Sequence, residues 1–276
     1  MIRAFLFTVL YTVLLAPVAA LADVPFNPTP RDQLPNAIIG NAGPLAGQDL
    51  NYYPANPATR GYLSVPKGED KKGAVILIHE WNGLTQRIRE TADAFAAEGY
   101  VALAADLYQG RTGNNRTENM ALVNQSLADP EQIIKNLESA VTYLQSRADV
   151  NGRVAAVGWC YGGGVALSFA LGSEHHNGTA IFYGRLVDDP EKLKHLNHEI
   201  LGTFAELDQS PSPAQVDAFA EALRQAGIAN DIHIYDEVHH GFWLHVDRNP
   251  ETTTGPALAA WNRLRDYLGR TIGVSE

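Results

Sequence analysis

The chain contains a single cysteine, which lies between two glycines in the segment Gly158-Trp159-Cys160-Tyr161-Gly162. A thiolate attacks carbonyl carbons readily, so a cysteine in a suitable site can open esters, lactones and thioesters. The spacing glycine-x-nucleophile-x-glycine is typical of a sharp turn between a strand and a helix, where bulk beside the nucleophile would clash. A helix that begins just after Cys160 would direct its N–H groups and the positive end of its dipole at the sulfur, which favours the thiolate. We therefore predict that Cys160 is a nucleophile; the alternative is a buried structural cysteine beside a glycine-rich helix.

A nucleophile on such a turn needs a histidine base and an acid that orients the base, and these follow it in the order acid, histidine. The apolar segment 201–205 is followed by Glu206-Leu207-Asp208, and Asp208 lies just beyond the end of the predicted strand. We predict that Asp208 is the orienting acid. Glu206 is a rival that overlaps the end of the strand, and Asp208 could instead cap the helix that begins near Pro213.

Two histidines follow the last predicted strand, in the segment Val238-His239-His240-Gly241. This loop can approach the nucleophile, because in open α/β sheets functional loops gather at the carboxyl ends of the strands. We predict that His240 is the general base, with His239 as the neighbour that could be confused with it. A metal site built from His239, His240 and His245 is a weaker alternative without strand–helix support, so we expect no metal and no cofactor. The other histidines in polar segments are predicted to lie at the surface: His175, His176, His195 and His198.

The segments that would position these residues alternate between strand and helix patterns. Continuous aliphatic runs predict buried strands, and apolar residues spaced three and four apart predict helices. The predicted strands are 50–53, 61–65, 74–79, 101–105, 154–157, 179–183, 200–205 and 228–235, the first two as a hairpin. The predicted helices are 86–98, 129–146, 162–171, 213–226 and 256–268. Parallel strands need crossovers and helices cover both faces, so we predict an α/β-hydrolase fold: a mostly parallel, doubly covered sheet in a three-layer αβα sandwich.

The N-terminal residues have the pattern of an export signal. Arg3, the apolar run 4–15 and Ala20-Leu21-Ala22 predict a secretory signal peptide over residues 1–22, cleaved after Ala22. The alternative is a membrane anchor, for which the apolar run is short. We expect a periplasmic or secreted protein with an extended N-terminal lead-in over residues 23–47 and one hydrolase domain over 48–276. The lone cysteine leaves no possibility of an internal disulfide.

The composition of the chain narrows the function classes. The 276 residues are 45% hydrophobic and 19% charged, which is an ordinary globular balance able to form a sizeable core. The formal net charge of −10 argues against a broad nucleic-acid-binding surface.

These motifs resemble the dienelactone hydrolase family of α/β-hydrolases. The activity for which the family is named is that of a carboxymethylenebutenolidase. The resemblance covers roughly residues 50–268 and rests on the segments 79–84 and 106–108, the cysteine turn, Asp208 and the segment 240–242. It implies that Cys160 is the nucleophile, His240 the base and Asp208 the residue that orients the base. It also implies that Glu80 holds the thiol proton at rest and moves away when substrate binds; the alternative for this residue is a structural salt bridge.

The resemblance also implies an oxyanion hole and a substrate pocket. The backbone N–H groups of Trp81 and Tyr161 are expected to bind the oxyanion. The aromatic residues expected to line an apolar pocket, although aromatics also fill cores, are Trp81, Tyr108, Trp159 and Trp243.

The arginines differ from those of the family, which bind the carboxylate of dienelactone near the Asp-Leu-Tyr segment and a few residues after the histidine. At the position after the histidine this chain has Leu244 and not an arginine. Near the Asp-Leu-Tyr segment it has Arg111, which is shifted by one residue from the family position. Arg111, Arg116 or Arg185 could bind an anionic group instead.

The sequence thus predicts a hydrolase of small-molecule esters, lactones or thioesters that acts through a Cys-His-Asp triad and a thioester acyl-enzyme. A competing hypothesis is a non-catalytic exported binding protein that reuses the fold. A thiol redox protein is the weakest hypothesis, because there is no second, resolving cysteine. We expect a small-molecule substrate as the partner, no nucleic acid, no membrane after signal cleavage, and a monomer or weak homodimer.

Overall fold

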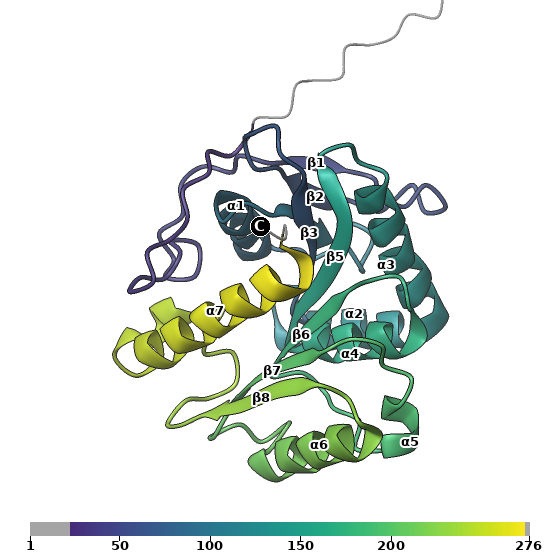
Figure 1. Ribbon diagram of the computed structural model, residues 1–276, viewed down its shortest axis with the longest axis vertical. Helices are drawn as coiled ribbons and strands as arrows, with labels where there is room; N and C mark the ends of the chain where they lie inside the picture. The colour runs from purple at the N-terminus through teal and green to yellow at the C-terminus, as the bar shows by residue number, and fades with distance from the viewer. Residues whose placement is uncertain (1–22, 274–276) are drawn as a thin grey trace, which may run out of the picture.

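An eight-stranded sheet runs through the computed structural model, which describes residues 23–273 (Figure 1). The predicted signal peptide lies outside these described residues. The strands are β1 (Gln48–Leu50), β2 (Gly61–Ser64), β3 (Lys72–Ile78), β4 (Val101–Ala105), β5 (Val150–Trp159), β6 (Gly178–Phe182), β7 (Ile200–Ala205) and β8 (Asn230–Tyr235). Their order across the sheet is β1-β2-β4-β3-β5-β6-β7-β8.

The sheet is antiparallel only at one edge. Strands β1 and β2 form the predicted hairpin, and β2 also pairs antiparallel with β4. All pairings from β4 to β8 are parallel. The prediction of a mostly parallel sheet in an α/β-hydrolase fold is confirmed. As a consequence, the carboxyl ends of β3, β5, β6, β7 and β8 all lie at one edge of the sheet.

Helices cover both faces of this sheet, as expected for parallel strands joined by crossovers (Figure 1). The helices are α1 (Gln86–Ala97), α2 (Arg116–Leu127), α3 (Pro130–Gln145), α4 (Tyr161–Gly172), α5 (Pro190–Leu193), α6 (Pro213–Ala226) and α7 (Pro250–Ile272), with a 3₁₀ turn at Val246–Arg248. Helices α1 and α7 share one core cluster with the sheet. Helices α3 and α4, and further along α5 and α6, form the clusters on the opposite face.

Two helices were not predicted, for identifiable reasons. Helix α2 buries only Asn119 and Leu122, so it lacks the apolar stripe by which a helix is recognised in a sequence. Helix α5 is a single short turn that begins at Pro190 after an Asp189 cap. Helix α7 begins earlier than predicted, and Pro256 lies inside it, in its second turn.

The N-terminal lead-in packs more closely than its composition suggests. Leu34 and Ile38 are buried in the core cluster that contains α1 and α7. The Asn27 N–H donates to the carbonyl of Ala97 at 3.0 Å, and the Val24 N–H donates to Val65 at 2.8 Å. The lead-in therefore closes one side of the sheet.

The prediction that all polar-segment histidines lie at the surface is wrong for His176. This side chain is 2% exposed, and its Nε2 lies 3.0 Å from the Thr179 hydroxyl. The same hydroxyl lies 2.8 Å from Nε2 of His198. Burial lowers the pKa of His176 to about 3 and that of His198 to about 4, so both are neutral structural groups.

The cysteine turn depends on close backbone approach. A Cβ on Gly158 would overlap the carbonyl oxygen of Gly162, and a Cβ on Gly162 would overlap the carbonyl of Ile78 at the end of β3. Because both obstacles are backbone atoms, no side chain can move to make room. The first turn of α4 can therefore approach β3 only with glycine at this position.

This close approach predicts opposite outcomes for two helical glycines. Gly162→Ala should destabilise the protein by about 3 kcal/mol or more, since backbone would have to shift. Gly269→Ala, in α7 with nothing within 4 Å of the added Cβ, should be neutral or stabilise by about 0.5–1 kcal/mol. The midpoints of urea unfolding give both values; equal midpoints for the two variants would contradict the steric argument.

Candidate active site

Cys160 lies at the junction between β5, which ends at Trp159, and α4, which begins at Tyr161. Its backbone has φ +56°, in a region that L-residues other than Asn and Asp rarely adopt. Such strain persists only where the surroundings impose it, and functional turns are typical places for it. The Cys160 N–H donates to the carbonyl of Phe182 at 3.0 Å, which ties the turn to the end of β6.

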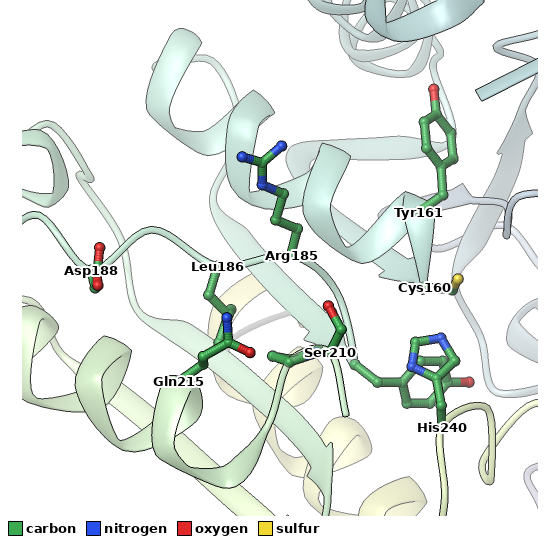
Figure 2. Close-up of a pocket in the computed structure, with 10 residues that line it drawn as sticks. Cys160, Tyr161, Arg185, Leu186, Asp188, Ser210, Gln215 and His240 are labelled. Carbon is green, nitrogen blue, oxygen red and sulfur yellow. The ribbon is translucent and has the colours of Figure 1, made fainter. Parts of the chain in front are cut away.

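The thiol faces a cavity of about 440 Å³ at the carboxyl edge of the sheet. Figure 2 shows Cys160 and His240 next to each other at one end of this cavity, with Asp188 and Gln215 at the other. Cys160 is partly exposed, so its sulfur is neither buried in the core nor on the open surface. A small molecule that entered the cavity would meet both the thiol and the imidazole.

The imidazole of His240 is held by Asp208. Nδ1 of His240 lies 2.6 Å from Oδ2 of Asp208, and the other carboxylate oxygen accepts the Ser210 N–H at 2.9 Å. Burial lowers the pKa of His240, but hydrogen bonds to Asp208 and to the Cys160 side chain, with the charges of both, outweigh it and raise the pKa to about 10. The arrangement therefore favours an imidazolium beside the sulfur.

The structure also separates these residues from their sequence rivals. Glu206 is exposed, and its carboxylate accepts the Glu237 N–H at 2.9 Å. The His239 side chain is exposed and makes no hydrogen bond among the described residues. Only Asp208 and His240 of the four candidates lie in contact with each other.

The two backbone amides that the sequence predicts for an oxyanion hole have no hydrogen-bond partner among residues 23–273. Within the described part of the chain, neither the Trp81 N–H nor the Tyr161 N–H donates a hydrogen bond. Trp81 follows β3, and Tyr161 is the first residue of α4. The Tyr108 hydroxyl donates to the Trp81 carbonyl at 3.2 Å, which fixes the loop that carries the first amide.

Glu80 has a partner that sequence reasoning missed. The carboxylate is buried, and its Oε2 lies 2.8 Å from Nε2 of His245. The hydrogen bonds of the described residues include none between Glu80 and Cys160. The expected contact of Glu80 with the thiol proton is therefore not formed here. The pairing of Glu80 with His245 instead matches the alternative of a salt-bridge acid.

Tyr183 is the other residue that sequence reasoning missed. It follows β6 directly, has φ +40°, and lines the cavity with Cys160. Its ring centroid lies 4.9 Å from that of His240. The available signal was its place at the carboxyl end of a buried strand, where functional residues gather.

The prediction that Trp159 and Trp243 bind substrate is wrong. Both side chains are completely buried, and their rings stack on each other with centroids 5.5 Å apart. Neither lines the cavity that contains the thiol. Trp159 is the last residue of β5 and packs with Phe182 and Trp243 in the core cluster that contains α1 and α7.

Tyr108 and Arg111 lie at a different cavity of about 170 Å³, between the β4 loop and helices α2 and α3. The Tyr108 side chain is 1% exposed, and Arg111 donates to the Tyr108 carbonyl at 2.9 Å and to Gln125 at 2.9 Å. They support the loop instead of lining the cavity at the thiol. Arg116 is exposed on α2, whereas Arg185 lines the larger cavity.

Residues 23–273 show neither a metal-binding cluster nor a membrane-spanning helix. This part of the chain holds no cluster of three or more His, Cys, Asp or Glu side chains that could bind a metal ion. None of its helices has the length and apolar character needed to cross a bilayer.

Comparisons with known proteins identify a family and relatives for this chain. The sequence model of the Dienelactone hydrolase family matches residues 59–272. A protein of Methylorubrum extorquens named "Putative carboxymethylenebutenolidase" is 29% identical over 229 residues, covering 78% of this chain and 77% of the relative. One of the same name from Saccharolobus solfataricus is 28% identical and covers 76% of this chain and 93% of the relative.

Solved structures show the same fold. The crystal structure titled a "Putative Dienelactone Hydrolase" of Klebsiella pneumoniae has a TM-score of 0.68 at 22% identity, over 77% of this chain and 93% of that one. A dienelactone hydrolase-like promiscuous phosphotriesterase from metagenomic libraries has a TM-score of 0.71 at 18% identity, over 82% and 98% of the two chains.

The raised pKa of His240 predicts a pH dependence of stability. Because the folded protein holds this proton more tightly than the unfolded chain, the contribution is fully present below the ordinary pKa of 6.5 and is lost as the pH rises toward about 10. We expect His240→Gln to flatten the fall in stability over this range. His239→Gln, the adjacent control, should keep it. Urea midpoints at pH 6, 8 and 10 provide the measurement, and identical slopes in both variants would refute the argument.

Proposed function

This chain belongs to the dienelactone hydrolase family, and we propose that it hydrolyses an ester or lactone bond of a small molecule with Cys160 as nucleophile. The observation that carries the proposal is the meeting of a thiol and an imidazole at one cavity, with a carboxylate behind the imidazole. A thiol on a strained turn lies next to an imidazole, and that imidazole is bonded at 2.6 Å to a carboxylate. Such a set is the arrangement used for nucleophilic acyl transfer.

The proposed reaction begins with a thiolate–imidazolium pair. The Cys160 sulfur forms a bond to the carbonyl carbon, and the electron pair of the carbonyl moves onto its oxygen. The N–H groups of Trp81 and Tyr161 donate to this oxyanion. When the carbonyl re-forms, the bond to the alcohol oxygen breaks and His240 gives that oxygen its proton, leaving a thioester.

Water completes the cycle. His240, now neutral, takes a proton from water as the oxygen attacks the thioester carbon. The carbon–sulfur bond then breaks, which restores the thiolate and the imidazolium and releases a carboxylic acid. With a lactone the alcohol remains attached to the acyl group, so the single product is a hydroxy acid. Asp208 keeps the imidazole oriented with Nε2 toward the sulfur throughout.

The first test is hydrolysis of a small aryl ester. Cys160→Ala should lower kcat/KM by about 10³-fold or more while the far-ultraviolet circular dichroism stays unchanged, because the covalent route is lost. His240→Gln should lower it by a similar factor, and His239→Gln should retain nearly full activity. Wild-type activity in Cys160→Ala, or the absence of turnover across esters, lactones and thioesters, would favour the competing hypothesis of a binding protein.

The cavity next to the thiol also holds groups that support an acidic substrate. Arg185 lines it and has no ion pair or hydrogen bond among the described residues, in a chain whose net charge is −10. Gln215 uses its Oε1 to accept the Ser212 N–H, which leaves its amide N–H groups for a ligand. We propose that Arg185 binds a carboxylate on the substrate. The sequence left this role open among Arg111, Arg116 and Arg185. Asp188 lies on the same cavity and would oppose an anion.

This assignment predicts charge-specific changes in KM. For an ester with a carboxylate on its acid side, Arg185→Gln should raise KM by about tenfold, the order expected for one charge-assisted hydrogen bond. The neutral methyl-ester analogue should be unaffected. Asp188→Asn should change KM for the acidic ester in the opposite direction. Equal effects of Arg185→Gln on KM for the acidic and the neutral ester would show that the guanidinium does not bind the substrate carboxylate.

A further inference from the structure

A second cavity, of about 170 Å³, lies beside the loop after β4 and is separate from the cavity at the thiol. Helices α2 and α3 and the loop between β1 and β2, which contains Asn56, complete its walls. It is smaller than the pockets of about 300–1,000 Å³ that hold drug-sized ligands, so it suits one small molecule. The proposed hydrolysis leaves this cavity without a task.

The buried polar residues of the second cavity are already bonded within the protein. The Asp106 carboxylate is 1% exposed and accepts the N–H groups of Arg60 and Gly110 at 2.7 and 2.6 Å. Asn136 donates to the Asp106 carbonyl at 3.1 Å and accepts the Tyr52 hydroxyl at 2.6 Å. These bonds hold the buried wall of the cavity in place without a ligand.

Three amide side chains that line the cavity are each held at one end only. Oε1 of Gln125 accepts from Arg111 at 2.9 Å, and Oδ1 of Asn56 accepts the backbone N–H two residues later at 3.1 Å. Gln132 donates to the Tyr53 hydroxyl at 2.6 Å. Within residues 23–273 the opposite end of each amide has no hydrogen-bond partner. The lining therefore provides free amide donors and a free carbonyl acceptor on side chains that are already oriented.

This combination of donors and acceptors fits hydroxyl groups, because each hydroxyl both donates and accepts a hydrogen bond. A side chain that is already fixed by one hydrogen bond loses little further freedom when a ligand binds, which lowers the cost of binding. Leu107, Leu122 and Ile133 add apolar surface to the lining. Such surface can contact the C–H groups that a sugar ring or polyol carries between its hydroxyls.

The charge of the lining argues against an acidic ligand. Of the described residues that line the cavity, Asp106 and Asp129 carry carboxylates and Arg111 is the cation. The Arg111 guanidinium is already bonded to the Tyr108 carbonyl and to Gln125. An anion would therefore meet more like charge than opposite charge, whereas a neutral ligand avoids this repulsion.

Tyr161 connects the second cavity with the proposed reaction site. Figure 2 shows its ring pointing away from Cys160. Its hydroxyl lies 2.6 Å from the Ser126 hydroxyl. Tyr161 lines the cavity at the thiol, and Ser126 lines the second cavity. The two cavities are therefore neighbours, joined through the contact between these two side chains.

We propose that the second cavity binds a neutral, hydroxyl-rich ligand, which is a single sugar ring or a small polyol. Two sources have this chemistry: a free sugar or polyol, and the sugar part of an ester whose acyl group reaches Cys160. Only the second source rests on the proposed function. The binding itself makes and breaks no covalent bond.

A ligand-observed NMR titration with methyl β-xyloside tests the site. The wild-type protein should bind this probe, and Gln125→Glu should weaken binding by about fivefold, the order expected for one neutral hydrogen bond. The substitution replaces the free amide donor with an acceptor and keeps the oxygen that accepts from Arg111. Asn56→Asp makes the same exchange at a second position and should have a similar effect.

Asn115→Asp is the matched control. Asn115 accepts the Glu118 N–H at 3.0 Å, so the substitution keeps that bond and adds the same negative charge. Asn115 lies at the start of α2 but does not line the cavity. This variant should bind methyl β-xyloside as the wild type does. Circular dichroism of each variant shows that it is folded.

Three results would overturn the site. The first is no binding of methyl β-xyloside to the wild type, which would show that the cavity holds only solvent. The second is an unchanged dissociation constant in both Gln125→Glu and Asn56→Asp. The third is binding of propionate in preference to methyl β-xyloside, which would identify an anion site instead.

Ester hydrolysis distinguishes the two sources. For a sugar that is part of the substrate, Gln125→Glu should lower the ratio of kcat/KM for an acetylated methyl β-xyloside to that for ethyl acetate by about fivefold. An unchanged ratio, together with weakened binding of methyl β-xyloside, would assign the site to a free sugar or polyol. Intact binding of the probe without turnover of any ester would overturn the proposed function and leave the site in place.

Discussion

Close packing of backbone around Cys160 is the constraint on which the rest of the site depends. Helix α4 begins so near to β3 and β6 that a Cβ on Gly162 would overlap the Ile78 carbonyl, and one on Gly163 would come within 2.8 Å of the Phe182 carbonyl. The chain can turn there only by placing Cys160 at φ +56°. That conformation places the thiol at the cavity, immediately before the first amide of α4. One steric condition thus exposes the nucleophile and provides groups that stabilise negative charge beside it.

The second organising feature is the pairing of two buried carboxylates with histidines. Asp208 contacts His240 at 2.6 Å, and Glu80 contacts His245 at 2.8 Å. The two histidines belong to the same loop after β8, so any shift of that loop would move both pairs relative to the sulfur. One pair is open to the cavity and can exchange protons with a substrate, whereas the other is shielded from it. This difference separates two chemically similar pairs, of which only Asp208–His240 has a task in the proposed mechanism.

The sequence predicted those parts of the molecule that short-range rules govern. Glycines spaced around Cys160 reflect local sterics, and aliphatic runs such as 74–78 reflect burial on both faces of a sheet, so both can be read from neighbouring residues. Asp208 and His240 could be placed near the thiol because strand ends gather at one edge. The contact between Glu80 and His245 spans 165 positions in the chain. It depends on how an irregular loop folds, for which no periodic pattern exists.

The aromatic residues show a further limit of composition-based reasoning. Trp159 and Trp243 were expected at the substrate, but both are completely buried and stack on each other in the core. The polar groups Arg185, Ser210 and Gln215 line the cavity in their place. A tryptophan satisfies a core and a pocket equally well, so its type carries little information on location. An arginine without an acidic partner is costly to bury and is therefore placed at a solvent-connected rim, where it can meet an anion. The substrate preference of this chain is accordingly better inferred from its unpaired charge than from its aromatic residues.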